Sequence, residues 1–306
     1  MSSTAKGSVE LRVISAHRPL RVHIAEIWEY RELLEGLIRK ELKVRYKNSV
    51  LGFVWSMVQP VFLLCVYALV FSILGASFDN FPIWLLCGLI PWTLVSTSLS
   101  TAATSVTVNQ HLVSKVPFPR AVLPLATLGS ALVHFTLQMG AFAIVLLVAR
   151  HNIDWAYAPL LPVAVIVTAM LLAGMALMLA VMNVYARDTQ HLLDLALVGM
   201  FWANPIIYQY ARAAEWFAKR GWPSGMPLLN PFTSIIITFQ RVIYGSDRVA
   251  IKPVGPDFQK WKPLLPHASQ WWYLRNLGII GAVAFGLMIL GLWLFDRAEG
   301  NFAEVL

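Results

Sequence analysis

The chain has 306 residues, of which 58% are hydrophobic and 13% are charged, and its formal net charge is +8. Globular proteins carry about 25% charged residues, so roughly half of the usual surface charge is missing and much of the exterior must avoid water. This composition excludes an ordinary soluble enzyme, a disordered chain and a nucleic-acid reader, because the basic excess sits on an apolar chain. Cys65 and Cys87 both lie in apolar runs, which argues against a disulfide framework or a thiolate metal site.

The first 49 residues are polar and charged, and they contain no apolar stretch of the kind found in signal peptides. We therefore expect residues 1–28 to be a tail that the mature protein keeps. In residues 29–49 the apolar side chains recur from Tyr30 to Leu42 at the spacing of one helical face, and the opposite face is charged. This pattern predicts an amphipathic helix that lies in the membrane interface.

The charged face of this helix has two interpretations. It either anchors the protein on the membrane surface or, more specifically, binds an anionic group such as a phosphate or pyrophosphate through charge-assisted hydrogen bonds. The basic residues that would do so are Arg39, Lys40, Lys43, Arg45 and Lys47.

Residues 50–306 are predicted to form an all-α transmembrane domain with six spans. A bilayer core about 30 Å thick needs about 20 apolar residues per helix. The fifth candidate is the weakest, because it is short, contains Asp194 and includes the helix-breaking pair Asn204-Pro205. The six candidate stretches are 50–74, 81–106, 121–149, 155–183, 192–208 and 272–295.

The distribution of basic residues predicts the orientation. The first 49 residues hold ten Lys or Arg, whereas the short loop around Asp79 holds none, so the positive-inside rule places the N-terminus in the cytoplasm. Six spans then return the C-terminus to the same side. The connection 209–271 would lie outside; its apolar stretch 232–244 is too short to span, which favours re-entrant or surface-lying helices.

Motifs of catalysis are missing from the sequence. It has no G-x-x-x-x-G-K-[ST] phosphate loop, so this chain does not cradle ATP in that way, and it has no zinc-protease, serine-hydrolase or Cys/His metal motif. His134 is interpreted as a hydrogen-bonded helix contact, and the Arg187-Asp188 pair, taken alone, as a solvated loop pair. We therefore expect no catalytic residue, metal or cofactor in this chain.

Aromatic side chains are frequent within and at the ends of the spans. Most such residues form interfacial belts or simple packing contacts. The alternative is that several line one cavity, where their flat faces would stack on sugar rings. The candidates for such a lining are Trp55, Phe62, Tyr67, Phe201, Trp202 and Tyr208.

Several motifs resemble the membrane subunit of ABC-2 type polysaccharide exporters. The run 37–55 with Gln59-Pro60 is similar to the start of that subunit, and the similarity continues from about residue 29 to the C-terminal end. Two positions depart from the pattern: Pro117 stands where an aromatic or aliphatic residue is usual, and Asn204 replaces a serine. The other matching segments are 115–120, 122–124, 185–188, 204–208, 229–232 and 300–304.

The resemblance implies a homodimer of six-span subunits in the bacterial plasma (inner) membrane, with both termini cytoplasmic, paired with two copies of a separate ATPase that binds ATP and magnesium. It implies export of a polyprenyl-pyrophosphate-linked polysaccharide for cell wall biogenesis, for which we prefer galactan over O-antigen, teichoic acid or capsule. By analogy, the helix at 29–49 is a gate near the lipid pyrophosphate, and helices between spans five and six form an outer gate. The residues implied to couple to the ATPase are Gln110, His111, Lys115, Phe118, Arg120, Arg187 and Asp188.

Three alternatives stay open. A drug or small-lipid exporter of the same architecture would enclose a narrow seam instead of a wide aromatic channel. A membrane glycosyltransferase or acyltransferase would require paired acids or a His/Asp base near an interface, and the outer loops have only scattered acids. An ion-coupled or proton-coupled flippase would require a chain of buried carboxylates, and Asp194 is the one carboxylate expected at depth.

Overall fold

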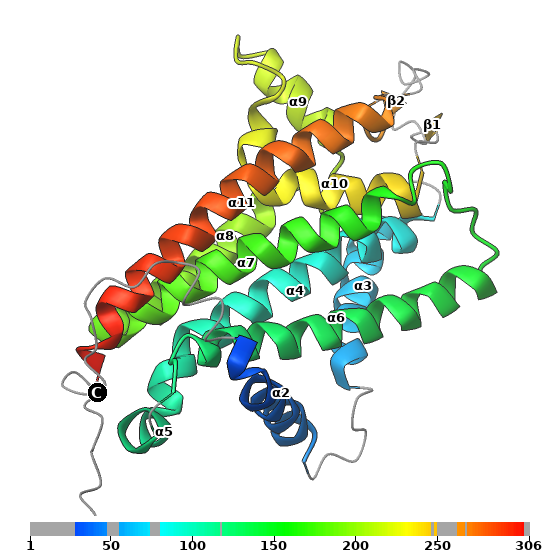
Figure 1. Ribbon diagram of the computed structural model, residues 1–306. Coiled ribbons are helices and arrows are strands. Elements are labelled where there is room, and N and C mark those ends of the chain that lie inside the picture. The colour runs from blue at the N-terminus through cyan, green and yellow to red at the C-terminus, as the bar shows by residue number, and fades with distance from the viewer. Residues whose placement is uncertain are drawn as a thin grey trace, which may run out of the picture.

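The computed structural model describes residues 28–47, 55–73, 80–116, 118–245, 248–249, 262–266 and 268–302, and it is a bundle of helices (Figure 1). The helices are α2 (Arg31–Tyr46), α3 (Trp55–Ile73), α4 (Phe81–Val108), α5 (Gln110–Lys115), α6 (Val122–Val148), α7 (Leu160–Tyr185), α8 (Asp188–Ala203), α9 (Tyr210–Ala218), the 3-10 turn η2 (Met226–Leu229), α10 (Pro231–Ile243) and α11 (Gln270–Glu299). Two short strands, β1 (Arg248–Val249) and β2 (Lys262–Pro263), pair antiparallel. Helix therefore dominates as predicted, whereas the strand pair was not expected.

Four helices of the described chain, α4, α6, α7 and α11, are long and apolar enough to cross a membrane. They confirm the second, third, fourth and sixth predicted spans. At the first and fifth positions lie α3, with 19 residues, and α8, with 16 residues. These two are not among the four, so the count of six spans stays a prediction, as do the domain boundaries.

The tightest helix pair is formed by α7 and α11, which run side by side in Figure 1. A Cβ atom added to Gly174 would lie 2.7 Å from the backbone carbon of Leu287, and one added to Gly291 would lie 2.7 Å from the carbonyl oxygen of Gly174. Small residues at such a crossing let the two backbones approach, which is how helices associate within a membrane.

Helix α10 forms the interior of the bundle, although it is too short to span a membrane. Every residue from Phe232 to Ile243 is buried, and the helix packs against α4, α7 and α11. It starts with a proline at its first position and an N-cap, since Asn230 Oδ1 accepts a hydrogen bond from the backbone N–H of Phe232 at 3.1 Å. The short apolar helix predicted at 232–244 is therefore present, and the expectation that it is re-entrant stays a prediction.

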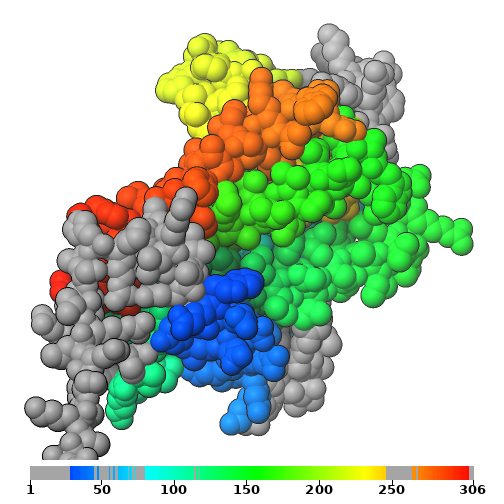
Figure 2. All heavy atoms as spheres, in the orientation of Figure 1, coloured from blue at the N-terminus to red at the C-terminus, as the bar shows by residue number. Residues whose placement is uncertain are grey.

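The two ends of the bundle carry different elements (Figure 1). At one end, here the α2 end, lie α2, α5 and the C-terminal end of α11; at the other, the α9 end, lie α9, η2 and the two strands. Figure 2 shows α2 as a patch on the surface of the bundle. Part of its predicted apolar face packs on the bundle: Leu37 is buried, and Ile38 lies so close to Gly129 of α6 that a Cβ there would be 2.5 Å from Ile38 Cδ1, whereas Leu33 is exposed.

Candidate functional site

Helix α4 leaves polar side chains accessible and buries its apolar ones, the reverse of a helix whose outer side faces lipid. Between Thr93 and Thr107 every residue that stays accessible is a serine or threonine, and every apolar residue is buried. The spacing of three and four residues places the hydroxyls on one side of the helix, over a length of about 21 Å. We call this set the hydroxyl face; its members are Thr93, Ser96, Thr97, Ser100, Thr101, Thr104 and Thr107.

The hydroxyl groups of this face donate hydrogen bonds to backbone carbonyls of α4 itself. Thr93 Oγ1 donates to the carbonyl oxygen of Leu89 at 2.8 Å, and Thr101 Oγ1 donates to that of Thr97 at 2.7 Å. The same pattern, a donor bonded to a carbonyl three or four residues earlier, holds for Ser96, Thr97, Thr104 and Thr107. Since each hydroxyl oxygen also has two lone pairs, the outward side of the face is rich in hydrogen-bond acceptors.

A carboxylate of α8 lies beside this face. Ser100 Oγ donates to Asp194 Oδ1 at 3.5 Å, and Asp194 is exposed. Ser100 precedes the last residue of the 28-residue α4 by eight positions, about 12 Å, which places the pair within the middle 30 Å of a helix about 42 Å long. Ionisable groups at that depth face a water-filled cavity or the interior of a protein. The hydroxyl face therefore points to water or to another protein surface, not to lipid.

Aromatic rings extend this polar face toward the α9 end. The ring of Phe201 lies 6.3 Å from that of Tyr67, 6.0 Å from that of Trp92 and 5.6 Å from that of Trp202, measured between centroids. The structure thus brings together three of the six predicted aromatic residues and adds Trp92. Of the other three, Trp55 and Phe62 are exposed on α3, and Tyr208 donates its hydroxyl to the carbonyl oxygen of Ala203 at 2.9 Å.

The break after α8 is fixed by side-chain amides. Asn204 Oδ1 accepts from Asn230 Nδ2 at 3.2 Å and from Thr233 Oγ1 at 3.1 Å, so the residue that departs from the family pattern connects the break to the start of α10. Gln240 Nε2 donates to the carbonyl oxygen of Pro205 at 2.8 Å, and Trp84 Nε1 donates to that of Ile206 at 3.1 Å. The Asn204-Pro205 pair therefore ends α8, as predicted, and the following residues are held against α4 and α10.

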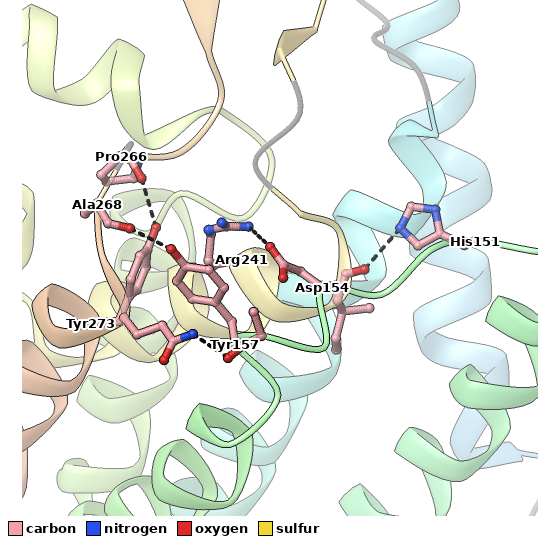
Figure 3. Close-up of polar contacts among 10 residues, drawn as sticks. His151, Asp154, Tyr157, Arg241, Pro266, Ala268 and Tyr273 are labelled. Atoms are coloured by element: carbon pink, nitrogen blue, oxygen red, sulfur yellow. Dashed lines mark hydrogen bonds and ion pairs between the residues drawn. The ribbon is translucent and has the colours of Figure 1, made fainter.

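A second polar group, shown in Figure 3, holds the C-terminal end of α10. Arg241 Nη1 lies 2.8 Å from Asp154 Oδ2, and the guanidinium carbon lies 3.8 Å from the centroid of the Tyr157 ring. The backbone N–H of Asp154 donates to the carbonyl oxygen of Val242, and a ring nitrogen of His151 lies 3.0 Å from that of Ile243. These residues, together with Tyr273, are called the Arg241 cluster below.

The same cluster reaches the start of α11. Tyr157 donates its hydroxyl to the carbonyl oxygen of Ala268 at 2.9 Å, and Tyr273 donates to that of Pro266 at 3.2 Å (Figure 3). Gln270 Nε2 donates to the carbonyl oxygen of Ala156 at 2.6 Å. The cluster thus joins α10, the connection between α6 and α7, and α11 into one unit.

Helix α9 is attached more loosely than α10. Only its first residue, Tyr210, is buried, and that burial raises the pKa of the phenol, so Tyr210 stays protonated. The outer side carries Trp216, whose ring lies under the Arg220 guanidinium at 3.6 Å. In Figure 2 the segment around α9 projects beyond α11.

The basic residues of α2 mostly point away from the bundle. Arg39 and Lys43, and Lys47 just after the helix, are exposed, and Arg39 lies 3.6 Å from the Glu35 carboxylate. Lys40 instead donates to Asn109 Oδ1 at 3.0 Å, which ties α2 to the turn between α4 and α5. The side chain of Arg45 lies outside the described part of the chain.

The residues implied to couple to an ATPase fall into two groups. Gln110, His111, Lys115, Arg187 and Asp188 are exposed at the α2 end. Phe118 packs against the apolar cluster around Leu37, and Arg120 is bound to the end of α11: its backbone N–H donates to Glu299 Oε1 at 2.9 Å, and its guanidinium donates to the carbonyl oxygen of Glu299. Arg120 thus also fixes the fold.

Within the described residues, no group of three or more His, Cys, Asp or Glu is arranged to hold a metal ion. Cys87 is buried, as its apolar surroundings suggest, whereas Cys65 is exposed on α3.

Comparisons with known proteins identify the family. Residues 32–244 match the sequence profile of the ABC-2 type transporter family. The chain is 32% identical over 222 residues to the O-antigen export system permease protein RfbA of Myxococcus xanthus, which covers 72% of this chain and 84% of that relative. It is 26% identical over 278 residues to a protein of the same name from Klebsiella pneumoniae, covering 90% and 95% of the two chains. The resemblance seen in the sequence motifs is therefore confirmed, and this chain belongs to the ABC-2 type transporter family.

Proposed function

We propose that this chain is the membrane subunit of an ATP-driven exporter that moves a polyprenyl-pyrophosphate-linked polysaccharide from the cytoplasmic to the outer leaflet. The observation that carries the proposal is the hydroxyl face with Asp194 at its side. A long hydrophilic polymer cannot cross hydrocarbon, because each unsatisfied polar group costs several kcal/mol there. The hydroxyl face offers hydrogen-bond partners along about 21 Å of the crossing. The relatives are named as permease proteins of O-antigen export systems, which supports a polysaccharide substrate.

The hydroxyl face needs a second wall to become a channel. In a single chain its oxygens and Asp194 are accessible, and exposure to lipid would leave a carboxylate in hydrocarbon. A second copy of the chain, facing the first across this surface, would enclose a polar path. Homodimerisation thus accounts for polar residues on the outside of a membrane helix.

The α2 end is proposed to face the cytoplasm and to receive the energy of ATP hydrolysis. A separate ATPase subunit, in two copies, would dock on α5, where His111 and Lys115 are exposed, and on Arg187 and Asp188. Movement of α5 would reach α4 directly and α2 through the hydrogen bond between Lys40 and Asn109. The ATPase would bind ATP and magnesium, and this chain would supply the path.

The remaining elements fit the course of a lipid-linked glycan. The exposed cations Arg39 and Lys43 of α2, and Lys47 just after it, are proposed to hold the pyrophosphate at the entrance through charge-assisted hydrogen bonds. The ring cluster around Phe201 is proposed to stack on sugar rings farther along, and the loosely held α9 to act as the outer gate. Galactan is our preferred cargo among the glycans of this class.

The test is depletion of the protein in its native host, followed by extraction of polyprenyl-linked glycans and assignment of their sugars and leaflet. Full-length polymer that accumulates on the cytoplasmic leaflet is the expected result, and it would name the glycan. Rescue by the wild-type gene is the control. A truncated glycan would favour the transferase alternative, and no change in any glycan would favour the small-lipid exporter.

The coupling part of the proposal is tested by charge reversal at Lys115. This side chain is exposed, so Lys115→Glu should keep the fold while export falls and ATP hydrolysis by the complex continues. Arg120→Glu is the less specific change, because it also breaks the contacts with Glu299. Unchanged export in Lys115→Glu would remove α5 from the coupling interface.

A further inference from the structure

The charges along the proposed path are unevenly distributed. The described residues of α3, α4 and α8 include no Lys or Arg, and Asp194 is exposed beside the hydroxyl face. Exposed cations lie instead toward the two ends of the bundle. Lys43, Lys47, Lys115 and Arg187 lie at the α2 end, and Arg212, Lys219 and Arg220 lie in or just after α9. The path therefore has a basic entrance and an interior that carries negative charge.

The hydroxyls of the hydroxyl face also share one role: they donate their hydrogen bonds to groups of this chain. Six hydroxyls of the hydroxyl face donate to carbonyls of α4, and Ser100 donates to Asp194. What this face offers outward is mainly acceptor lone pairs, and the carboxylate adds an acceptor that cannot donate when ionised. A ligand that fits such a surface must bring donors.

We propose that this face selects an uncharged glycan and rejects a polyanionic one, with Asp194 as the specificity-determining residue. Sugar hydroxyls donate hydrogen bonds to the face, and sugar rings stack on the ring cluster around Phe201. Phosphodiester groups have no donors at neutral pH and carry a charge of the same sign as Asp194, so a phosphate-linked polymer is repelled where a neutral polymer binds. The single pyrophosphate of the lipid carrier is held by the cations at the entrance. This inference rests on the proposed function and narrows its substrate class.

The test is binding of two oligomers to the purified full-length chain in lipid nanodiscs, followed by tryptophan fluorescence, since Trp92 and Trp202 lie beside Phe201. The probes are a neutral galactose decasaccharide and a glycerol-phosphate decamer. Wild-type protein is expected to bind the neutral oligomer at least about tenfold more tightly, because like charges brought together in an interface cost several kcal/mol. Asp194→Lys should reduce that ratio at least about tenfold, and Asp194→Asn should give an intermediate ratio.

The matched control is Glu32→Lys, which makes the same change in charge at an exposed residue of α2, away from the hydroxyl face. It should leave the ratio of the two affinities as in the wild type. Equal binding of both oligomers by the wild type, or a ratio that Asp194→Lys leaves unchanged, would overturn the selectivity and leave the export proposal standing. Binding of neither oligomer would contradict both, because a polar glycan path must hold a neutral glycan.

Discussion

Two polar regions of this helical bundle are built in opposite ways. In the Arg241 cluster, side chains from α10, the connection between α6 and α7, and α11 bond to one another and to backbone carbonyls, and the Arg241 side chain is only 8% exposed. On the hydroxyl face, the oxygens are accessible and a carboxylate stands beside them. A polar cluster whose side chains bond mainly to one another and to the backbone stabilises the fold, whereas one that leaves its acceptors open is suited to a ligand.

The difference also separates the two helices that were expected to form an outer gate. Helix α10 is buried from Phe232 to Ile243 and is held at both ends, by Asn204 at its start and by Asp154 near its C-terminal end. Helix α9 buries only Tyr210. If one of them moves during transport, the loosely attached α9 can do so with the smaller loss of free energy, because it breaks fewer contacts. Helix α10 would then stay in place.

The largest expected effect is on transport. Replacing Thr97, Ser100 and Thr101 together by leucine removes the centre of the hydroxyl face, so we expect export to fall at least about a hundredfold, since a loss of about 3 kcal/mol of hydrogen bonding along the path has that effect. Thr136→Leu is the control, because Thr136 is an exposed threonine of α6 that donates to its own helix in the same way. Export assays in cells measure both, and equal loss in the control would contradict the assignment.

The next effect is on stability. Asp154→Ala leaves the Arg241 guanidinium buried without its carboxylate, and we expect the free energy of unfolding to fall by about 3 kcal/mol, the lower part of the range for a broken buried pair, because Asp154 is partly exposed. Glu35→Ala breaks the exposed pair with Arg39 and should cost less than about 0.5 kcal/mol. Denaturant titration in detergent measures the two, and similar losses would mean that the cluster does not hold α10.

The smallest expected effect is the difference in the free energy of unfolding between two threonine variants. Thr233 is fully buried and donates to Asn204 Oδ1 at 3.1 Å, so Thr233→Val removes a buried hydrogen bond and should cost about 1 kcal/mol. Thr101→Val makes the same isosteric change on the hydroxyl face and should leave the free energy of unfolding within about 0.5 kcal/mol of the wild type. The reverse order would show that the hydroxyl face contributes to folding more than α10 does.

Much of the helical framework can be predicted from local sequence. The apolar residues between Tyr30 and Leu42 repeat at helical spacing and give α2, and unbroken apolar length gives α4, α6, α7 and α11. The break at Asn204-Pro205 follows from the geometry of proline. Each of these features depends on a few neighbouring residues, so a single sequence is enough to predict it.

The sites depend on residues far apart and are harder to predict. Arg241 and Asp154 are 87 positions apart, and Arg120 and Glu299 are 179 positions apart, so no local pattern pairs them. The hydroxyl face is different, because its spacing of three and four residues is visible in 93–107. A search for apolar stretches overlooks it, since serine and threonine do not interrupt such a stretch, and only the burial of the intervening residues shows which side is accessible.

The most direct test of the central claim, that the hydroxyl face meets water, is the reactivity of single cysteines. In a Cys65→Ser background, where the remaining Cys87 is buried, Thr97→Cys and Thr101→Cys are compared with Ile144→Cys and Ile166→Cys, which are exposed apolar positions on α6 and α7. Permeabilised membranes are treated with a membrane-impermeant maleimide, which reacts with the thiolate and so requires water at the site. We predict labelling at the two threonine positions and none at the two isoleucine positions. Unlabelled threonine positions, or equal labelling at all four, would contradict a water-filled path along α4.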